Sequence, residues 1–297
     1  MSGKFAKVRL NKNIDEIGFN NPLIKRSPAF IRKWYVENYM PLSVVKTTLC
    51  GVSGFEIALN CDNDASLEIL RCEAGALGVT TMFAAGDITL PHGFFLPTGQ
   101  PAKALFLDKI LDKAIRTKKI DPAHINLIII EGGKAFTEVV LESLYHRFNY
   151  LGLILENSCS KDYSKLASYI FNDCGLNINF GRRGSYLLKE ADIIINLSES
   201  ERGYESFYKK KACYIELGLS GENPAHIREK RKDILAVDGF YLSYEGEILP
   251  LRLFEMLMYL DCKPFYNFVK GRNIGESFKA AKNWVEYRSI NVRNLNF

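Results

Sequence analysis

The feature of this chain that most constrains its fold is a series of apolar β runs in its middle part. The runs are "INLIIIEGG" (125–133), "YLGLILEN" (150–157), "LNINFG" (176–181), "DIIINLSES" (192–200), "KACYIELG" (211–218) and "DILAVDGF" (233–240). Segments of helical pattern stand between the first four of them, at 134–148, 160–175 and 185–191. Strands that are apolar on both faces and alternate with helices form a parallel sheet that is covered on both sides. The sequence therefore predicts a doubly wound, Rossmann-like parallel sheet within residues 105–271.

The rest of the chain predicts a second domain. A length of 297 residues is enough for two domains, each with its own core. Residues 1–104 mix helix and strand patterns less regularly, and we expect them to form an α/β domain that binds the substrate. The last helical segment, "GESFKAAKNWVEYR" (275–288), is expected to pack on that domain together with the rest of 272–297. The expected fold class is α/β, in two domains.

Charge and cysteine content argue against several classes of function. The net charge is +5, from 39 basic and 34 acidic residues, and the basic clusters at 25–33, 208–211 and 228–232 are scattered. That is typical of solvated surfaces, so no nucleic-acid partner is expected. Seven cysteines without a C-x-x-C pair or a histidine at metal-ligand spacing indicate reduced thiols, with neither a disulfide framework nor a metal site.

The hydrophobic pattern also bears on location. No apolar run approaches the roughly 20 residues of a membrane span, and the N-terminus lacks the apolar core of a signal peptide. We therefore expect a cytoplasmic protein without membrane contact. A homodimer and a monomer are both compatible with the sequence.

A dinucleotide site is predicted where the first run of the parallel sheet ends. Gly132 and Gly133 would let the backbone approach a pyrophosphate, and the helix that begins at Lys134 would offer free N–H groups. Glu156 follows Gly133 by 23 residues, at the end of the second run, where a carboxylate would hold the adenosine ribose, with Asn157 beside it. The expected cofactor is NAD, with NADP as an alternative.

The glycine motif is incomplete, which keeps a second interpretation open. Ile130 stands where the first glycine of G-x-G-x-x-G is expected, and Glu131 would place a negative charge beside the phosphates. The segment is therefore also compatible with a structural β-turn-α unit that binds no nucleotide. The run at 192–200 ends in Asn196 and Ser198, which would lie on the nicotinamide side of a bound cofactor or simply close a buried strand.

Several segments, taken in order, resemble the shikimate/quinate dehydrogenase superfamily, and the resemblance covers most of the chain. The segments are "NNPLIKRSPAF" (20–30), "DITLPHG" (87–93), "NSCSKDYSKLA" (157–167), "LLKEADIIINLS" (187–198), "YIELGLSGENPAHIREKRKDILAVDGFYL" (214–242) and "FYNFVKG" (265–271). The resemblance implies a substrate domain, a dinucleotide-binding domain and an NAD(P)-dependent oxidation or reduction between them.

The departures from that superfamily's pattern change the expected chemistry. Gly93 takes the place of the lysine that closes N-V-T-x-P-x-K and exchanges a proton with the reacting hydroxyl, and no Asn-Thr-Asp segment occurs in 94–126. Ser158 replaces the arginine that would clamp a 2′-phosphate. Because hydride transfer at a hydroxyl needs a base, oxidation of shikimate is not expected.

The resemblance also implies the residues of the substrate site. His92 is the replacement acid or base available on the loop, since its pKa is naturally near neutrality, but it is equally compatible with a turn residue after Pro91. Substrate-binding residues are expected at Lys25, Ser27, Asp87, Thr89 and Glu245. Asp87 also suits a local backbone cap, and Lys25 an ordinary surface position.

The sequence thus leads to one expected function and two alternatives. The first is an NAD(P)-dependent oxidoreductase that acts on a small polar or carboxylated metabolite. The second is a non-catalytic regulator of the same fold that binds a nucleotide or metabolite. The third is an S-adenosylmethionine-dependent methyltransferase, because Glu131 and Glu156 match the two acidic strand ends of that class.

Overall fold

The computed structural model describes residues 3–11, 17, 21–61, 63–86, 88–121, 124–182, 184–199, 205–218, 222–237 and 239–296. The chain forms two compact units. The first comprises residues 1–98 and 252–266, and the second residues 99–251 and 267–297. These bounds differ from the expected 1–104 and 105–271, chiefly because the C-terminal part of the chain is shared between the units.

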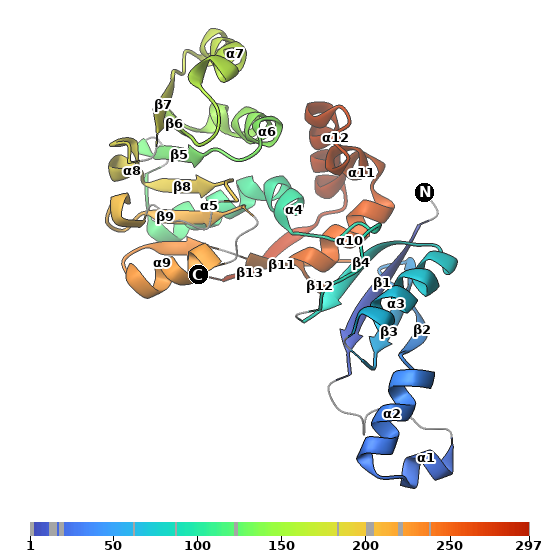
Figure 1. Ribbon diagram of the computed structural model, residues 1–297. Helices are drawn as coiled ribbons and strands as arrows, with labels where there is room; N and C mark the ends of the chain where they lie inside the picture. The colour runs from blue at the N-terminus through green and yellow to red at the C-terminus, as the bar shows by residue number, and fades with distance from the viewer. Residues whose placement is uncertain are drawn as a thin grey trace. The chain divides into compact units, whose positions relative to one another are not determined.

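The second unit contains a six-stranded parallel sheet with strand order β10-β9-β8-β5-β6-β7 (Figure 1). Its strands are β5 (Asn126–Ile130), β6 (Tyr150–Leu155), β7 (Ile178–Arg182), β8 (Ile193–Asn196), β9 (Cys213–Glu216) and β10 (Leu235–Val237). Numbered along the chain, the order is that of the doubly wound dinucleotide-binding fold, 3-2-1-4-5-6. The predicted fold class is therefore confirmed.

The apolar runs form the core of this sheet, as their composition predicts. Every residue of β8 and β9 is buried, and so are all but the first of β5 and β6. The helices of the unit's parallel part are α4 (Gln100–Leu105), α5 (Leu107–Lys118), α6 (Lys134–Leu144), α7 (Ser164–Cys174), α8 (Leu187–Glu190) and α9 (Glu222–Lys230), with short 3-10 helices η3 (Tyr145–Arg147), η4 (Ser160–Tyr163) and η5 (Glu205–Phe207). Both faces of the central strands β5, β6, β8 and β9 are thus removed from water, which is why they lack polar alternation.

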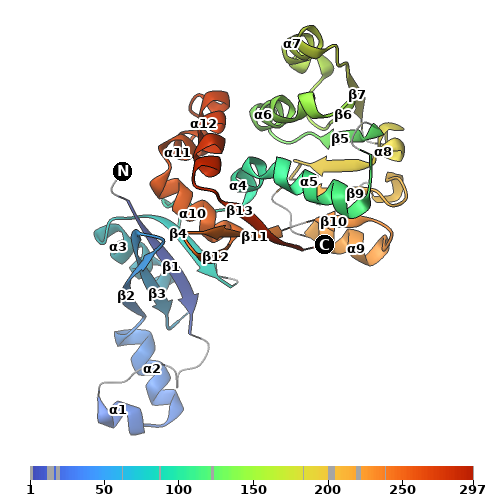
Figure 2. The ribbon, with the colours of Figure 1, turned by 180° about the vertical axis from the view of Figure 1, so that it is seen from behind.

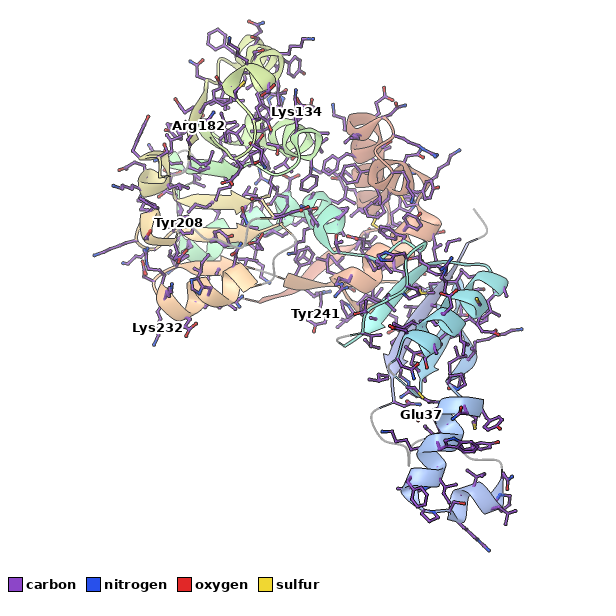
Figure 3. All side chains as sticks on the ribbon, in the orientation of Figure 1. Glu37, Lys134, Arg182, Tyr208, Lys232 and Tyr241 are labelled. Carbon is purple, nitrogen blue, oxygen red and sulfur yellow. The ribbon has the colours of Figure 1, made fainter. Side chains whose placement is uncertain are left out.

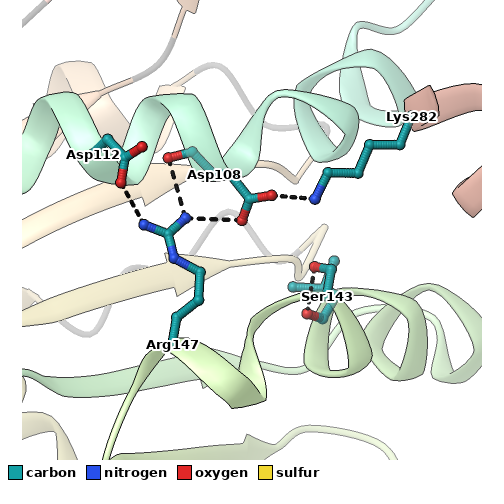
Figure 4. A network of polar contacts seen from close by, with 6 residues as sticks. Asp108, Asp112, Ser143, Arg147 and Lys282 are labelled. Atoms are coloured by element: carbon teal, nitrogen blue, oxygen red, sulfur yellow. Dashed lines mark hydrogen bonds and ion pairs between the residues drawn. The ribbon is translucent and has the colours of Figure 1, made fainter. Parts of the chain in front are cut away.

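The contacts of the C-terminal helix differ only in part from the expectation. Helix α12 (Ile274–Tyr287) packs against α6, and also against α4, which lies almost wholly within the expected residues 1–104 but belongs to the second unit. Figure 4 shows one reason: Lys282 of α12 forms an ion pair with Asp108 of α5. Asp108 also accepts a hydrogen bond of 2.9 Å from Arg147, and that guanidinium reaches Asp112 as well. The charges that fix α12 therefore belong to the second unit.

The second unit ends in a small antiparallel sheet that the sequence analysis did not predict. Its order is β12-β11-β13, formed by β11 (Gly239–Tyr244), β12 (Glu247–Pro250) and β13 (Asn291–Asn296). The central strand β11 alternates buried and less buried residues, as expected for a sheet with one covered face.

The first unit is built on a four-stranded sheet of order β2-β3-β1-β4. Its elements are β1 (Lys4–Leu10), α1 (Pro22–Arg26), α2 (Ala29–Tyr39), β2 (Leu42–Leu49), β3 (Val52–Leu59), α3 (Asp64–Ala76), β4 (Val79–Ala85), α10 (Leu251–Asp261) and the first part of α11 (Lys263–Val269). Strands β1, β3 and β4 are parallel, and β2 is antiparallel to β3. No described helix in either unit is long and apolar enough to span a membrane.

Helices α1 and α2 extend beyond the edge of this sheet at which β1 ends (Figures 1 and 2). They bury few side chains: none in α1 and only Val36 in α2. The sheet itself has a closed apolar core, to which Phe55, Ile57, Leu70 and Met82 contribute. The first unit is thus an α/β structure, as predicted.

Candidate functional site

The candidate site lies at the carboxyl ends of the parallel strands in the second unit. The strand order reverses between β5 and β8, where Ile130 pairs with Asn196 in the last register position. From β5 the chain continues to β6 and β7 on one side, and from β8 it continues to β9 and β10 on the other side. In open α/β sheets, ligands bind outside the carboxyl ends of the strands at this reversal.

The two predicted glycines have different physical roles. A Cβ atom at Gly132 would lie 2.3 Å from the backbone oxygen of Leu197, so glycine is required there for β5 and β8 to approach each other. A Cβ atom at Gly133 would meet nothing within 4 Å, and its φ of −62° and ψ of 134° suit any residue. Packing therefore explains Gly132 and leaves Gly133 unexplained.

Gly133 is also the N-cap residue of α6, and it makes no side-chain cap. Thr137 secures the turn instead: its hydroxyl accepts a hydrogen bond from the Gly132 N–H and donates one to the Gly133 carbonyl, both at 3.2 Å. The helix opens with the exposed Lys134 (Figure 3). Open space, a helix N-terminus and a cation at one point suit an anionic ligand group.

Glu131 does not lie where the sequence analysis expected it. Its carboxylate is turned into the loop that follows β6 and is only 2% exposed. It accepts hydrogen bonds from the backbone N–H groups of Glu156 (2.7 Å), Asn157 (3.1 Å) and Ser158 (3.3 Å). The hydroxyls of Ser158 and Tyr163 also donate to it, the latter over 2.6 Å. The expected repulsion of a phosphate at Gly133 is thus corrected, since this charge is engaged inside the protein.

The surroundings of Glu131 keep it ionised. Burial by itself would raise its pKa, but hydrogen bonds from Ser158, Tyr163 and the backbone N–H groups of the loop outweigh burial and lower the pKa below its usual value. Burial and the nearby carboxylate raise the pKa of Tyr163, so that its hydroxyl remains a donor. The loop after β6 is therefore organised around a permanent internal anion.

Glu156 and Asn157, predicted to contact the cofactor, stand at the end of β6. Glu156 is half-buried and Asn157 is exposed. Their N–H groups point at Glu131, which leaves their side chains as the groups able to meet a ligand. A half-buried carboxylate at the end of the second strand is the arrangement that accepts ribose hydroxyls in dinucleotide-binding folds.

Asn196 and Ser198 are brought together, but in a closed network. The Asn196 side chain donates to both carboxylate oxygens of Glu216, at 3.0 and 3.1 Å, and its oxygen accepts from the Ser198 N–H at 3.1 Å. Glu216 also accepts from Tyr214 and from the Gly218 N–H, each at 2.7 Å. The Asn196 amide therefore positions the ends of β8 and β9, and its contact with a cofactor stays a prediction.

Glu216 differs electrostatically from Glu131. It is 1% exposed, and burial raises its pKa, an effect that hydrogen bonds from Tyr214 and Asn196 only partly offset. Lys103 of α4 also lies nearby and donates to the Glu216 backbone carbonyl at 2.9 Å. Sequence inspection missed this group and the role of Tyr163, although both glutamates directly follow apolar runs.

The predicted residues of the substrate site lie mostly in the first unit. Thr89 and His92 are exposed on the loop after β4, whose Ile88 and Leu90 pack on the core of the unit. The alternation of "ITL" thus points Thr89 outward. Gly93 has a φ of 101°, a conformation that favours glycine over the superfamily's lysine. Asp87 lies outside the described residues.

Lys25 and Ser27 belong to the α1 region. Lys25 is exposed in the last turn of α1, and the Ser27 hydroxyl donates to the Leu23 carbonyl at 2.7 Å. Because β1 and β4 are parallel neighbours, both strands end at the same end of the sheet, and α1 and the loop after β4 follow those ends in the chain. In both views α1 stands at the end of α2 that lies away from the sheet (Figures 1 and 2), and the role of Lys25 and Ser27 at a substrate stays a prediction.

Glu245 is in the turn between β11 and β12 of the second unit. Its φ is 52°, and its carboxylate forms an exposed ion pair of 3.0 Å with Arg288. A substrate hydroxyl or amino group would have to compete with that arginine for Glu245.

The part of the chain that the structure describes contains neither a metal-binding cluster nor a disulfide. No group of three or more His, Cys, Asp or Glu side chains there is placed to hold a metal ion. The seven cysteines all fall within the described ranges and form no disulfide.

Comparisons with known proteins give structural likeness but no family. No family model and no curated protein matches the sequence. Among solved structures, L-tryptophan dehydrogenase from Nostoc punctiforme aligns over 96% of this chain and 80% of its own, with 13% identity and a TM-score of 0.40. Shikimate 5-dehydrogenase from Listeria monocytogenes, in complex with shikimate and NAD, aligns over 93% and 95%, with 8% identity and a TM-score of 0.36. The 5-ketofructose reductase of Gluconobacter sp. strain CHM43 aligns over 95% of this chain and 99% of its own, with 12% identity and a TM-score of 0.34. Scores this low assign neither a family nor an activity to this chain.

Proposed function

We propose that this protein is an NAD(P)-dependent oxidoreductase that acts on a small polar or carboxylated metabolite. The observation that carries the proposal is Gly133, a glycine that neither packing nor backbone conformation requires, at the N-terminus of α6 and at the strand-order reversal. Space kept free of a side chain at that point is what a pyrophosphate needs.

The residues of the second unit would then bind and orient the cofactor. The first turn of α6 and Lys134 would meet the pyrophosphate, and the Glu156 carboxylate would accept hydrogen bonds from the adenosine ribose. When bound, the dinucleotide supplies hydride donation or acceptance. The network of Asn196 and Glu216 would hold the ends of β8 and β9 in place below the reactive ring.

The first unit would supply the substrate side. His92 is the proposed acid or base, because it is exposed on a loop whose neighbouring apolar residues are fixed in the core. Thr89, Asp87, Lys25, Ser27 and Glu245 remain proposed substrate contacts. The order of motifs shared with the shikimate/quinate dehydrogenase superfamily supports this division of roles, and Gly93 supports a substrate other than shikimate.

The alternatives are supported less well. A methyltransferase was suggested by two acidic strand ends, but the Glu131 carboxylate is engaged with the loop after β6 and is not available to a ligand. A non-catalytic nucleotide-binding regulator is supported by the absence of the superfamily's lysine at Gly93. Turnover assays decide between it and the proposed enzyme.

The cofactor half of the proposal is tested by Gly133→Val. The valine side chain would occupy the space for the pyrophosphate, so the variant should fold and lose NAD(H) binding by at least tenfold in calorimetry. Gly239→Val is the matched control, because a Cβ atom there also meets nothing within 4 Å and the site lies on β11. Unchanged NAD(H) affinity in a folded Gly133→Val variant would contradict the proposal.

The catalytic half is tested by His92→Ala in a screen of NAD-linked turnover on small hydroxy, oxo and amino acids. Loss of a general acid or base lowers the rate by roughly 10²–10⁴. His124→Ala, a change at an exposed histidine of the second unit, is the control and should keep full turnover. Full turnover in His92→Ala would remove His92 from the mechanism.

A further inference from the structure

The loop after β6 is built as an anion site, and the protein fills that site itself. Three successive backbone N–H groups, those of residues 156–158, converge on one oxygen of the Glu131 carboxylate. Such concave runs of N–H groups bind anions, phosphates among them. The hydroxyls of Ser158 and Tyr163 complete the set of donors on the other oxygen.

The position of this loop in the fold connects the Glu131 carboxylate with the choice of cofactor. In a doubly wound sheet, the loop after the second strand contacts the adenosine ribose and decides between a 2′-hydroxyl and a 2′-phosphate. A 2′-phosphate is held by donors and by cationic side chains. Here the backbone donors of the loop are turned inward to Glu131, and Glu156 adds a second carboxylate at the strand end.

We propose that Glu131 is a specificity-determining residue that makes the adenosine site accept a 2′-hydroxyl and reject a 2′-phosphate. It acts in two ways. Its charge occupies the anion position of the loop, and its hydrogen bonds turn the N–H groups of residues 156–158 inward, so that the side chains of Glu156 and Asn157 are left to meet the ribose. This inference rests on the proposed function and adds the cofactor's identity to it.

The test uses two adenosine compounds that differ only by the phosphate in question. Binding of adenosine 5′-monophosphate and of adenosine 2′,5′-bisphosphate to the full chain is measured by calorimetry. Wild type should bind the monophosphate at least tenfold more tightly. In Glu131→Ala the charge is gone and five donor groups are released, so the ratio should move toward the bisphosphate by at least tenfold.

Two further variants separate charge from folding. Glu131→Gln keeps the size of the side chain and removes its charge, and the ratio should move in the same direction by a smaller factor. Ser143→Ala removes a hydroxyl that donates to the Val140 carbonyl of α6 and does not contact Glu131, so its ratio should stay within about twofold of wild type. If Glu131→Ala does not fold, Glu131→Gln decides.

The outcomes are distinct. Monophosphate binding by wild type with an unchanged ratio in Glu131→Ala and Glu131→Gln would overturn this inference and leave the proposed function standing. Tighter binding of the bisphosphate by wild type would also overturn it. If wild type binds neither compound, the proposed function fails and this inference falls with it.

Discussion

Strands β5 and β9 of the parallel sheet each lead to a buried glutamate at their carboxyl end, and the surroundings of the two glutamates differ. At the end of β5, Glu131 is surrounded by backbone N–H groups of a partly exposed loop, and an open glycine lies two residues further on. At the end of β9, Glu216 is surrounded by the buried side chains of Asn196, Tyr214 and Asn223. The first end leaves space for a ligand, whereas the second is filled.

The glycines show the same contrast. A Cβ atom at Gly218 would lie 2.1 Å from the Ser198 backbone oxygen and 2.7 Å from the Glu216 carboxylate, so the chain is closed at that point. At Gly133 nothing lies within 4 Å. At the carboxyl ends of the parallel strands, the chain is therefore closely packed at Gly218 and open at Gly133.

The largest expected effect concerns the two carboxylates. Glu216→Ala should lower the free energy of unfolding by about 3–5 kcal/mol, because Asn196, Tyr214 and the Gly218 N–H would lose their acceptor in a buried place. Glu131→Ala should cost less, about 1–3 kcal/mol, since water can reach the loop of residues 156–158. Urea denaturation of both variants measures the difference. A larger loss of unfolding free energy in Glu131→Ala than in Glu216→Ala would contradict the view that Glu216 is the more closely packed of the two.

The two glycines should give the next largest difference. Gly218→Ala forces a methyl group against backbone and carboxylate atoms, and we expect a loss of about 1–3 kcal/mol. Gly133→Ala should leave stability unchanged or raise it by about 0.4–1 kcal/mol, because alanine adopts this backbone conformation and has fewer unfolded states. Thermal unfolding with and without NAD checks both. Destabilisation by Gly133→Ala would mean that packing, not a ligand, explains the glycine.

The smallest effect is the opposite pH dependence of the two sites. The folded pKa of Glu131 is below 4.5, so its contribution to stability is present above pH 4.5 and is lost as the pH falls through the folded pKa. The folded pKa of Glu216 is above 4.5, so ionised Glu216 begins to cost stability as the pH rises past 4.5, and the cost is complete above the folded pKa.

Glu→Gln variants isolate the contribution of each carboxylate to the pH dependence of stability. Unfolding free energies of wild type, Glu131→Gln and Glu216→Gln are compared from about pH 3 to about pH 8. The advantage of wild type over Glu131→Gln should shrink on the acid side of pH 4.5, and its advantage over Glu216→Gln should shrink on the alkaline side. Changes in the same direction at both positions would contradict the pKa directions.

The apolar runs of the sequence predict the parallel sheet of the second unit. Most runs from 125 to 240 lack polar alternation, as strands covered on both faces do, and strands β5 to β10 fall inside the predicted runs except that β7 extends one residue further, to Arg182. The sequence also located the glycine turn and Glu156 at strand ends, because the end of an apolar run marks the point where the chain returns to water.

The directions of the polar groups at those strand ends depend on packing between elements that are distant in the sequence. Glu131 and Asn196 were both expected at a ligand, but their partners, Tyr163 and Glu216, come from other elements 32 and 20 residues away along the chain. Likewise, the periodicity of α12 does not name its partners, one of which is Asp108, 174 residues distant in sequence from Lys282. Periodicity records which face of an element is buried, whereas the choice of partner depends on the three-dimensional packing that brings distant charges and hydrogen-bonding groups together.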